Sequence, residues 1–299
     1  MCLSLNAQIF NMIKYNPKTW FNHIFKFHKS DTFYVLWKEL IFIGLLTFGF
    51  VYIELHYFKH MEFLSNLMAV YSLIGFVLSL LLVFRTNSAY ERWWEGRKKW
   101  GELVNTTRNL SIRIAAMDAP ADVKDFFARM IPNYAIAMKE QLRDGVKLEE
   151  LDLTDEELEE IKKVNHKTSY IVKCMYEKLH LLKKQGLLTQ EEYLAMDSNV
   201  KPFSDITGAC ERIKSTPIPY SYSMFLKKFI FIYVTTVPLA FISTFGYYSA
   251  LVAIFIFYVL VSIEVLAEEI EDPFGRDDND LPTDEICIKI KANVKEILR

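Results

Sequence analysis

Acidic side chains are concentrated in one stretch near the C-terminal end of the sequence, on both sides of a Pro273-Phe274-Gly275 turn. Carboxylate oxygens at this density are the ligands that a hard cation such as calcium prefers. The spacing lacks the glycine and the terminal glutamate of an EF-hand loop. A solvated acidic turn therefore explains the pattern more simply than a cation site does. The stretch comprises Glu264, Glu268, Glu269, Glu271, Asp272, Asp277, Asp278 and Asp280.

Other groups that could do chemistry are scattered along the sequence. The four cysteines form no CxxC pair, so neither a disulfide framework nor a zinc knuckle is indicated. The six histidines do not cluster beside the acidic stretch, and there is no phosphate-binding glycine loop or nucleophile elbow. We therefore predict that the protein is not an enzyme and requires no cofactor. A membrane-bound metal-dependent enzyme or scaffold that uses the acidic stretch stays open as an alternative.

The composition predicts a helical membrane protein. Of 299 residues, 52% are hydrophobic, and only 10 glycines and 9 prolines supply turns, so most of the chain is expected to be helix. The formal net charge of -2 offers no basic field for nucleic acid. Two uncharged runs, 63–84 and 229–263, are long enough to cross a bilayer, and the second divides into two spans at Gly246. A weaker candidate at 36–57 makes four predicted transmembrane helices.

Positively charged flanks predict the orientation of these spans. Lysines before the first span, arginines and lysines after the second, and Lys227 and Lys228 before the third all favour the cytosolic side. Both termini are therefore predicted to be cytosolic, in a multi-pass protein of the cell membrane. The predicted segments are a cytosolic N-terminal segment at 1–35, transmembrane helices 1 and 2 at 36–84, a helical cytosolic region at 85–228, transmembrane helices 3 and 4 at 229–263, and an acidic cytosolic segment at 264–299.

The cytosolic region contains clear helix markers. Thr154 followed by Glu157 predicts a capping box at the start of one helix. No proline occurs between Lys18 and Ala119, so the helix of the second span is expected to continue well into the cytosol, past Trp100. The chain is therefore predicted to be all-α, with a helical cytosolic layer in addition to its membrane spans.

Three bulky apolar residues of the second span, Phe76, Leu80 and Phe84, are spaced four apart and share one helix face. Ser72 and Gly75 beside this apolar stripe allow another helix to approach closely. On a single membrane helix, such a stripe is ordinary lipid-facing or core packing. If several chains arrange this helix around an axis, the stripe forms stacked hydrophobic rings that can gate a pore by dewetting. Spacing alone leaves both interpretations open.

Three motifs cover most of the chain. They are the stretch from Phe84 to Arg97, which contains Arg92, Trp93 and Trp94; Ala209-Cys210-Glu211-Arg212-Ile213 followed by Thr216-Pro217-Ile218-Pro219; and Asp272-Pro273-Phe274-Gly275-Arg276-Asp277-Asp278-Asn279-Asp280-Leu281-Pro282. Taken alone, the first motif is typical of an aromatic belt with cations at a membrane surface. Together, the three motifs resemble the bestrophin family, particularly its bacterial branch, in which they occur in the same order with similar spacings.

The resemblance implies a homopentameric ion channel in which the second helix of every subunit lines one central pore. The three residues of the apolar stripe, counted back from Arg92, fall at the family's neck positions, so the resemblance implies a hydrophobic gate rather than packing. A second, cytosolic constriction is expected on a helix after the large insertion, with Leu194 as the best candidate and Ile206 as the alternative. The implied partners are further copies of the chain, the lipid bilayer and small monovalent ions.

The resemblance also bears on calcium. Animal members of the family bind calcium at the acidic segment, and Asp277 and Asp280 match the side-chain ligands of that site. In this sequence Arg276 stands where an acidic residue is usual, and Asn279 replaces another. An added cation lowers calcium affinity electrostatically, and bacterial relatives generally lack the calcium switch. We therefore expect no calcium binding, or only weak binding at Asp277 and Asp280.

Ion selectivity is left open by the resemblance, because animal members favour anions whereas a bacterial relative can favour monovalent cations. Two of the three stripe residues are aromatic, and their positive ring edges suit an anion. The aliphatic Leu80 and the acidic C-terminal segment favour cations instead. We predict conduction of chloride and similar anions, with a sodium-type cation channel of the same fold as the alternative.

Overall fold

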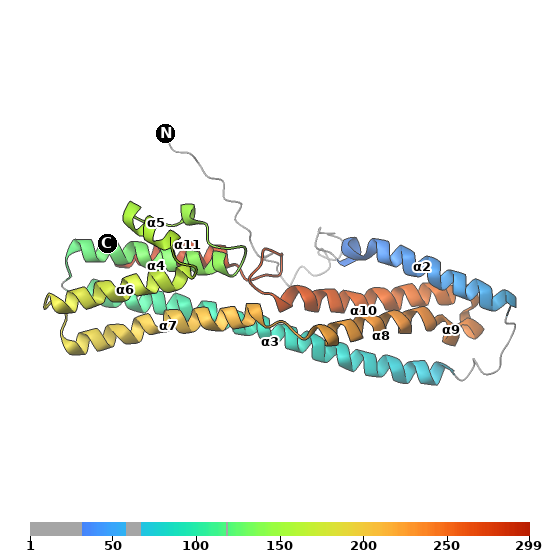
Figure 1. Ribbon diagram of the computed structural model, residues 1–299. Helices are drawn as coiled ribbons and strands as arrows, with labels where there is room; N and C mark the ends of the chain where they lie inside the picture. Colours follow the sequence, from blue (N-terminus) through green and yellow to red (C-terminus); the bar gives the residue numbers. More distant parts are fainter. Residues whose placement is uncertain (1–31, 58–66, 118) are drawn as a thin grey trace. The chain divides into compact units, whose positions relative to one another are not determined.

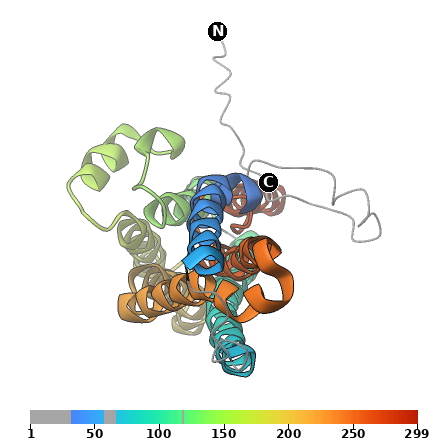
Figure 2. The same cartoon turned by 90° about the vertical axis from the view of Figure 1, so that its right-hand side faces the viewer.

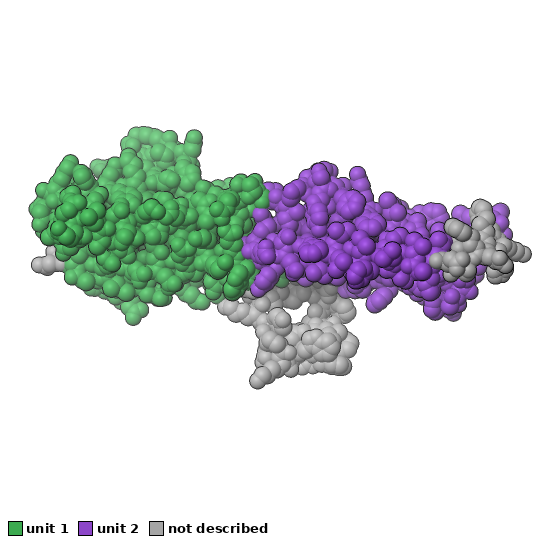
Figure 3. Space-filling model, turned by 90° about the horizontal axis from the view of Figure 1, so that it is seen from below, with its two compact units in different colours: residues 1–13, 93–216, 272–299 green, residues 14–92, 217–271 purple. Residues whose placement is uncertain are grey.

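The structure is a computed structural model that describes residues 32–57, 67–117 and 119–299. These residues are almost entirely helical and contain no strand, which confirms the predicted all-α class. They divide into two compact units, drawn in green and purple in Figure 3. Among the described residues, unit 1 contains 93–117, 119–216 and 272–299, and unit 2 contains 32–57, 67–92 and 217–271.

Unit 2 is a group of long apolar helices. In Figures 1 and 2, α10 lies beside α2, and α8 also packs against α10. Ile43, Leu78, Leu226 and Phe257 are among the residues of the core that these helices share. The helices are α2 (Thr32–Tyr57), the first part of α3 (Leu67–Ala116), α8 (Tyr220–Thr236), α9 (Pro238–Phe245) and α10 (Ser249–Glu271).

The break predicted in the long apolar run of unit 2 is confirmed. The short 3-10 helix η4 (Gly246–Tyr248) separates α9 from α10. Gly246 has a φ of 53°, a left-handed conformation in which a side chain would clash with its own backbone. Glycine therefore lets the chain leave α9 and start a new helix.

Three segments of the described residues are long and apolar enough to cross a membrane, namely α2, α3 and the stretch 220–271, which contains α8, α9, η4 and α10. Helix α2 starts at Thr32, four residues before the predicted span at 36–57. Residues 63–66 of the predicted second span lie outside the described residues. Leu45 on α2 is 71% exposed and Phe255 on α10 is 67% exposed, as suits side chains that face hydrocarbon.

Helix α3 extends far beyond its apolar part. It continues for 50 residues without interruption from Leu67 to Ala116, as the lack of proline predicts. Its residues up to Arg92 belong to unit 2, and those from Trp93 belong to unit 1. One helix therefore carries both the apolar stripe and the first family motif.

Unit 1 is a helical layer around a core that includes Trp100, Phe127 and Phe203, none of which is exposed. Helix α4 packs against α6 and α11, and α6 packs against α7. The predicted capping box at Thr154 is confirmed, and Thr189 forms a second one at the start of α7. Besides the last part of α3, the elements are α4 (Ala121–Gln141), η3 (Leu148–Glu150), α5 (Asp155–Lys162), α6 (Lys167–Lys184), α7 (Gln190–Ser215) and α11 (Thr283–Ile297).

Candidate functional site

The apolar stripe lies on the exposed face of α3. Phe76, Leu80 and Phe84 are 61%, 43% and 63% exposed, whereas Leu78 and Leu82 on the opposite face are buried in the core of unit 2. The three stripe residues therefore cover little of their own unit. Such a face suits either lipid or the corresponding faces of further subunits, and the role of the stripe as a pore neck stays a prediction.

The opposite side of α3 is held closely against α8. A Cβ atom at Gly75 would lie 2.7 Å from the hydroxyl oxygen of Tyr233, so a larger residue there would have to displace that hydroxyl. The hydroxyl of Tyr222 also donates to the carbonyl oxygen of Leu81 over 3.1 Å. The close helix approach predicted for Gly75 is confirmed, whereas the Ser72 hydroxyl donates to Met68 within its own helix.

The two candidates for the cytosolic constriction differ in exposure. Leu194, in the first turns of α7, is 56% exposed, whereas Ile206 of the same helix is completely buried in the core of unit 1. A side chain that is enclosed by its own subunit has no surface to offer to an ion path. The burial of Ile206 therefore favours Leu194, whose role as an aperture residue stays a prediction.

The first and third motifs meet in unit 1. The indole nitrogen of Trp93 donates to the carbonyl oxygen of Asn279 over 3.0 Å. A Cβ atom at Gly96 would lie 3.1 Å from the ring of Phe274 and 3.2 Å from Pro273. Glycine inside a helix costs about 1 kcal/mol relative to alanine, and here its small size lets the buried Pro273-Phe274 turn pack on α3.

The remaining residues of the first and second motifs either bind backbone groups or lie at the surface. In unit 2, the Arg92 side chain donates from Nε to the carbonyl oxygen of Glu271 over 3.1 Å. Trp94 is 47% exposed. Pro217 is exposed, and Pro219 is the N-cap residue of α8, where a proline costs no helical hydrogen bond.

A buried charge network in unit 1 joins α4 to α11, and it was not predicted from the sequence. Lys139 Nζ lies 2.8 Å from Glu140 Oε1 and 2.9 Å from Asp284 Oδ1. Arg143 donates from Nη2 to Asp284 Oδ2 over 2.8 Å and from Nε to the carbonyl oxygen of Gly275 over 3.1 Å. The network thus holds the Phe274-Gly275 turn as well as the two helices. No local sequence pattern could have predicted this network, because Lys139 and Asp284 are far apart in the sequence.

The network shifts the protonation equilibria of its members. Burial alone would raise the pKa of Asp284, but hydrogen bonds from Arg143 and Lys139 outweigh it and hold the pKa below its ordinary value. Burial alone would lower the pKa of Lys139, but hydrogen bonds to Glu140 and Asp284 raise it above its ordinary value. Asp284 and Lys139 therefore both keep their charges at neutral pH.

The described residues do not fit a calcium site. Asp280 Oδ2 accepts the backbone N–H of Asp277 over 2.6 Å, and its buried Oδ1 has no hydrogen-bond partner among the described residues. Burial raises the pKa of Asp280 to about 7, which favours a proton on this carboxyl group. The side chain of Asp277 is exposed. No group of three or more histidine, cysteine or acidic side chains within the described residues could hold a metal, whereas calcium takes about six to eight oxygens.

Calcium at micromolar concentration is therefore expected to leave the protein unchanged. The melting temperature of the detergent-purified protein should be the same, within about 1 °C, in micromolar free calcium and in excess chelator, because one unpartnered carboxylate oxygen does not replace a hydration shell. Asp280→Asn serves as the control, because calcium should not change the melting temperature of a protein that lacks the Asp280 carboxylate. A large calcium-dependent shift that Asp280→Asn abolishes would contradict this expectation.

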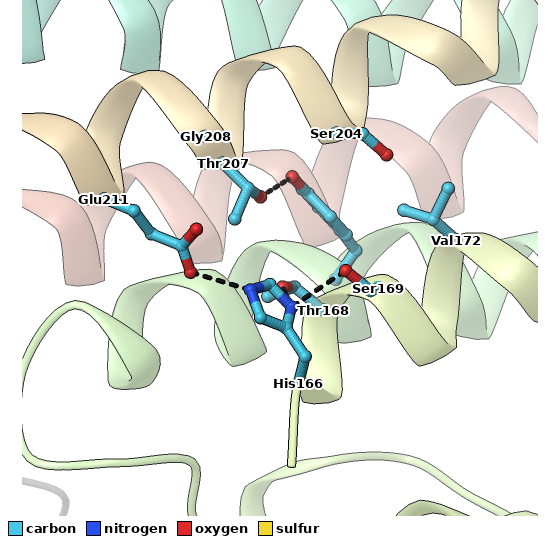
Figure 4. Close-up of a pocket in the computed structure, with 9 residues that line it drawn as sticks. His166, Thr168, Ser169, Val172, Ser204, Thr207, Gly208 and Glu211 are labelled. Atoms are coloured by element: carbon cyan, nitrogen blue, oxygen red, sulfur yellow. Dashed lines mark hydrogen bonds and ion pairs between the residues drawn. The ribbon is translucent and has the colours of Figure 1, made fainter. Parts of the chain in front are cut away.

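A small polar pocket lies in unit 1 between α4, the start of α6 and α7 (Figure 4). Its volume is about 160 Å³. His166 Nε2 lies 2.9 Å from Glu211 Oε1, and the hydroxyl of Ser169 lies 2.8 Å from His166 Nδ1. The Tyr134 hydroxyl of α4 is hydrogen-bonded to the Thr207 hydroxyl of α7. These contacts join three helices, which gives Glu211 of the second motif a structural role.

Comparisons with known proteins agree with the motifs. A family model described as Bacterial/Fungal Bestrophin protein matches residues 11–296. The voltage-dependent anion channel-forming protein sll1024 of Synechocystis sp. is 37% identical over 230 residues, which cover 75% of each chain. The voltage-dependent anion channel-forming protein YneE of Escherichia coli (strain K12) is 30% identical over 292 residues, which cover 96% of this chain and 94% of that protein.

A solved structure supports the same assignment. The crystal structure of a bacterial bestrophin homologue from Klebsiella pneumoniae matches this fold with a TM-score of 0.79 at 28% identity, covering 87% of this chain and 97% of that chain. Sequence motifs, family model and fold therefore agree over nearly the whole length. The chain belongs to the bacterial and fungal bestrophin family.

Proposed function

We propose that the protein is an ion channel of the cell membrane, in which five identical subunits surround one pore that passes small monovalent anions, chloride above all. Each subunit would cross the bilayer four times, with both termini in the cytosol. Residues 36–84 and 229–263 would contain the spans, and 85–228 would form the cytosolic region. Membership of the bestrophin family and the similarity to voltage-dependent anion channel-forming proteins support a channel.

The observation that carries the proposal is the apolar stripe on the broad exposed face of α3, on which Leu73 and Val83 are also 65% and 54% exposed. Phe76, Leu80 and Phe84 face away from the core of unit 2. The few apolar segments of one subunit cannot enclose a water path, so several copies must contribute a face each. Phenylalanine and leucine rings around an axis would form a constriction that excludes water until it widens. Leu194 would add a second constriction on the cytosolic side.

Four crossings are supported by the division of the third apolar segment. α8 and α9 precede η4, and α10 follows it. Helix α10 has 23 residues, which is enough for one crossing of a hydrocarbon layer about 30 Å thick. Contacts of α10 with α8 and α9 place the two halves of this segment beside each other. A turn at Gly246 on the outer face would therefore give two spans.

Chloride is favoured over sodium for two reasons. The relatives described above are named as forming anion channels, and none of those names supports the sodium alternative. The positive ring edges of Phe76 and Phe84 could also face an anion in the neck. The enzyme or scaffold alternative has less support, because the acidic stretch offers no group of three metal ligands within the described residues. No cofactor is proposed.

Electrical recording of the purified protein tests this function. In planar bilayers with a gradient of sodium chloride, we expect currents that reverse close to the chloride equilibrium potential. Replacing chloride by gluconate should reduce the current, whereas replacing sodium by N-methylglucamine should not. The native mass in detergent should equal five subunits. Currents that reverse near the sodium equilibrium potential would contradict anion conduction and support the sodium-type cation channel. A conducting monomer would contradict a pore that is shared by several subunits.

A further inference from the structure

Arg85 lies directly after Phe84 of the apolar stripe, yet its side chain is turned the other way. Phe84 is 63% exposed, whereas Arg85 is 1% exposed. Successive helix residues point about 100° apart, so α3 can present Phe84 outward while it buries Arg85. A buried arginine at the end of an apolar span is costly unless its charge is neutralised and its donors are satisfied.

Two glutamates of α10 provide the counter-charge. Arg85 Nη2 donates to Glu271 Oε2 over 2.6 Å, and Arg85 Nε lies 3.7 Å from Glu264 Oε2. The glutamates are two helical turns apart and share one face of α10. The first contact is a charge-assisted hydrogen bond, whereas the second is an ion pair without one. Arg85 is therefore anchored mainly through Glu271.

Glu271 connects three segments of unit 2. Its Oε1 accepts the backbone N–H of Ile218 over 2.6 Å, just before α8. Its backbone carbonyl accepts Arg92 Nε over 3.1 Å. Arg85 and Arg92 are seven residues apart, so they lie on the same face of α3. Two attachments on one face of a helix fix its rotation about its own axis.

Stability alone does not explain this cluster. Arg85 Nε and Nη1, and both carboxylate oxygens of Glu264, are buried without a hydrogen-bond partner among the described residues. Glu264 is 2% exposed. Apolar residues of similar volume often stabilise a fold as well as such an ion pair does. What the cluster adds over apolar packing is a specific orientation of α3 relative to α10.

We propose that Arg85 is a positioning residue for the pore neck: by its bond to Glu271 it holds the rotation of α3 at which Phe84 points to the pore axis. This inference rests on the proposed function, because the direction of Phe84 matters only if the stripe forms a neck. Arg85 itself stays buried and does not contact the permeant ion.

Glu271→Gln is the primary test variant, because it weakens the anchor while Arg85 keeps Glu264 as a counter-charge. With the anchor loosened, Phe84 should leave the axis more often, so the open probability in planar bilayers should rise about fivefold. Glu264→Gln removes no hydrogen bond and should have a smaller effect. Lys227→Gln is the matched control, since it breaks an exposed ion pair of 2.5 Å with Glu268 that joins α8 to the same helix. It should leave the open probability unchanged.

The same substitution in a Phe84→Ala background separates positioning from a general structural effect. If Arg85 acts through Phe84, Glu271→Gln should then change the open probability by less than about twofold. An equal change in both backgrounds, or none in either while the wild type conducts, would overturn the positioning role alone. Failure of both Glu271→Gln and Arg85→Lys to assemble would assign the cluster to folding and overturn it too. A wild type that passes no current would overturn the proposed function itself.

Discussion

Simultaneous replacement of Phe76, Leu80 and Phe84 by alanine is expected to raise the open probability of the channel about tenfold or more. In the proposed neck, each of these side chains contributes to a ring that keeps water out of a narrow apolar passage. Alanine removes most of each side chain, so the passage widens and the free energy needed to wet it falls. A decrease of about 1.4 kcal/mol in that free energy is already a factor of ten in the wet population.

The same substitution should cost little folding stability, because the three side chains are 61%, 43% and 63% exposed in the subunit. A matched control is available in Phe42, Leu45 and Phe255, which are 58%, 71% and 67% exposed on α2 and α10. Their triple alanine variant removes the same chemical groups, two phenylalanines and one leucine, from exposed faces that are not part of the proposed neck. Single-channel recordings of both variants should show a change only for the first. An equal change in both, or none in the first, would contradict a neck at the stripe.

The parts of the fold that were predictable from the sequence are those specified by neighbouring residues. The absence of proline predicted that α3 continues past its apolar part. Gly246 predicted the break before α10. The capping box of Thr154 has a local pattern. The box of Thr189 has the same pattern and could have been found in the same way.

The candidate site was predictable in part, for a related physical reason. Helical periodicity identifies which residues share a face, so the stripe of α3 could be predicted. Periodicity does not show what packs against that face. Arg85 was expected to be one of the cations that flank a span, whereas it is buried against α10. Its partner Glu271 was assigned to the acidic stretch as a solvated residue. Pairings between distant segments such as this one depend on tertiary packing, which a single sequence does not display.

Asp284→Asn is expected to lower the free energy of unfolding of unit 1 by about 3–5 kcal/mol. Asp284 is 16% exposed and accepts hydrogen bonds from Lys139 over 2.9 Å and from Arg143 over 2.8 Å. Its replacement leaves these two buried cations with Glu140 as their remaining buried carboxylate. An uncompensated buried charge is more costly than a missing ion pair, because the charge stays desolvated. The melting temperature should fall by about 10 °C.

A comparison with an exposed ion pair isolates the effect of burial. Asp205 lies 2.9 Å from Lys201 at the surface of α7, and their side chains are 57% and 69% exposed. Asp205→Asn makes the same chemical change as Asp284→Asn, and it should leave the melting temperature nearly unchanged. Tryptophan fluorescence on heating reports the loss of unit 1, because Trp100 is buried in its core. Equal shifts in the two variants would contradict the importance assigned to the buried network.

The pH dependence of the Asp284→Asn effect follows from the directions of the pKa shifts. The pKa of Asp284 is lowered in the folded state, so its contribution is present above the ordinary value near 3.8 and is lost as pH falls through the lower folded pKa. The pKa of Lys139 in the folded state is raised above its ordinary value of 10.5, so the contribution of Lys139 to stability is lost only when pH rises through this raised pKa. The difference in melting temperature between wild type and Asp284→Asn should therefore stay constant between about pH 5 and 9 and shrink below about pH 4. A difference that disappears near neutral pH would mean that the carboxylate is not held by these two cations.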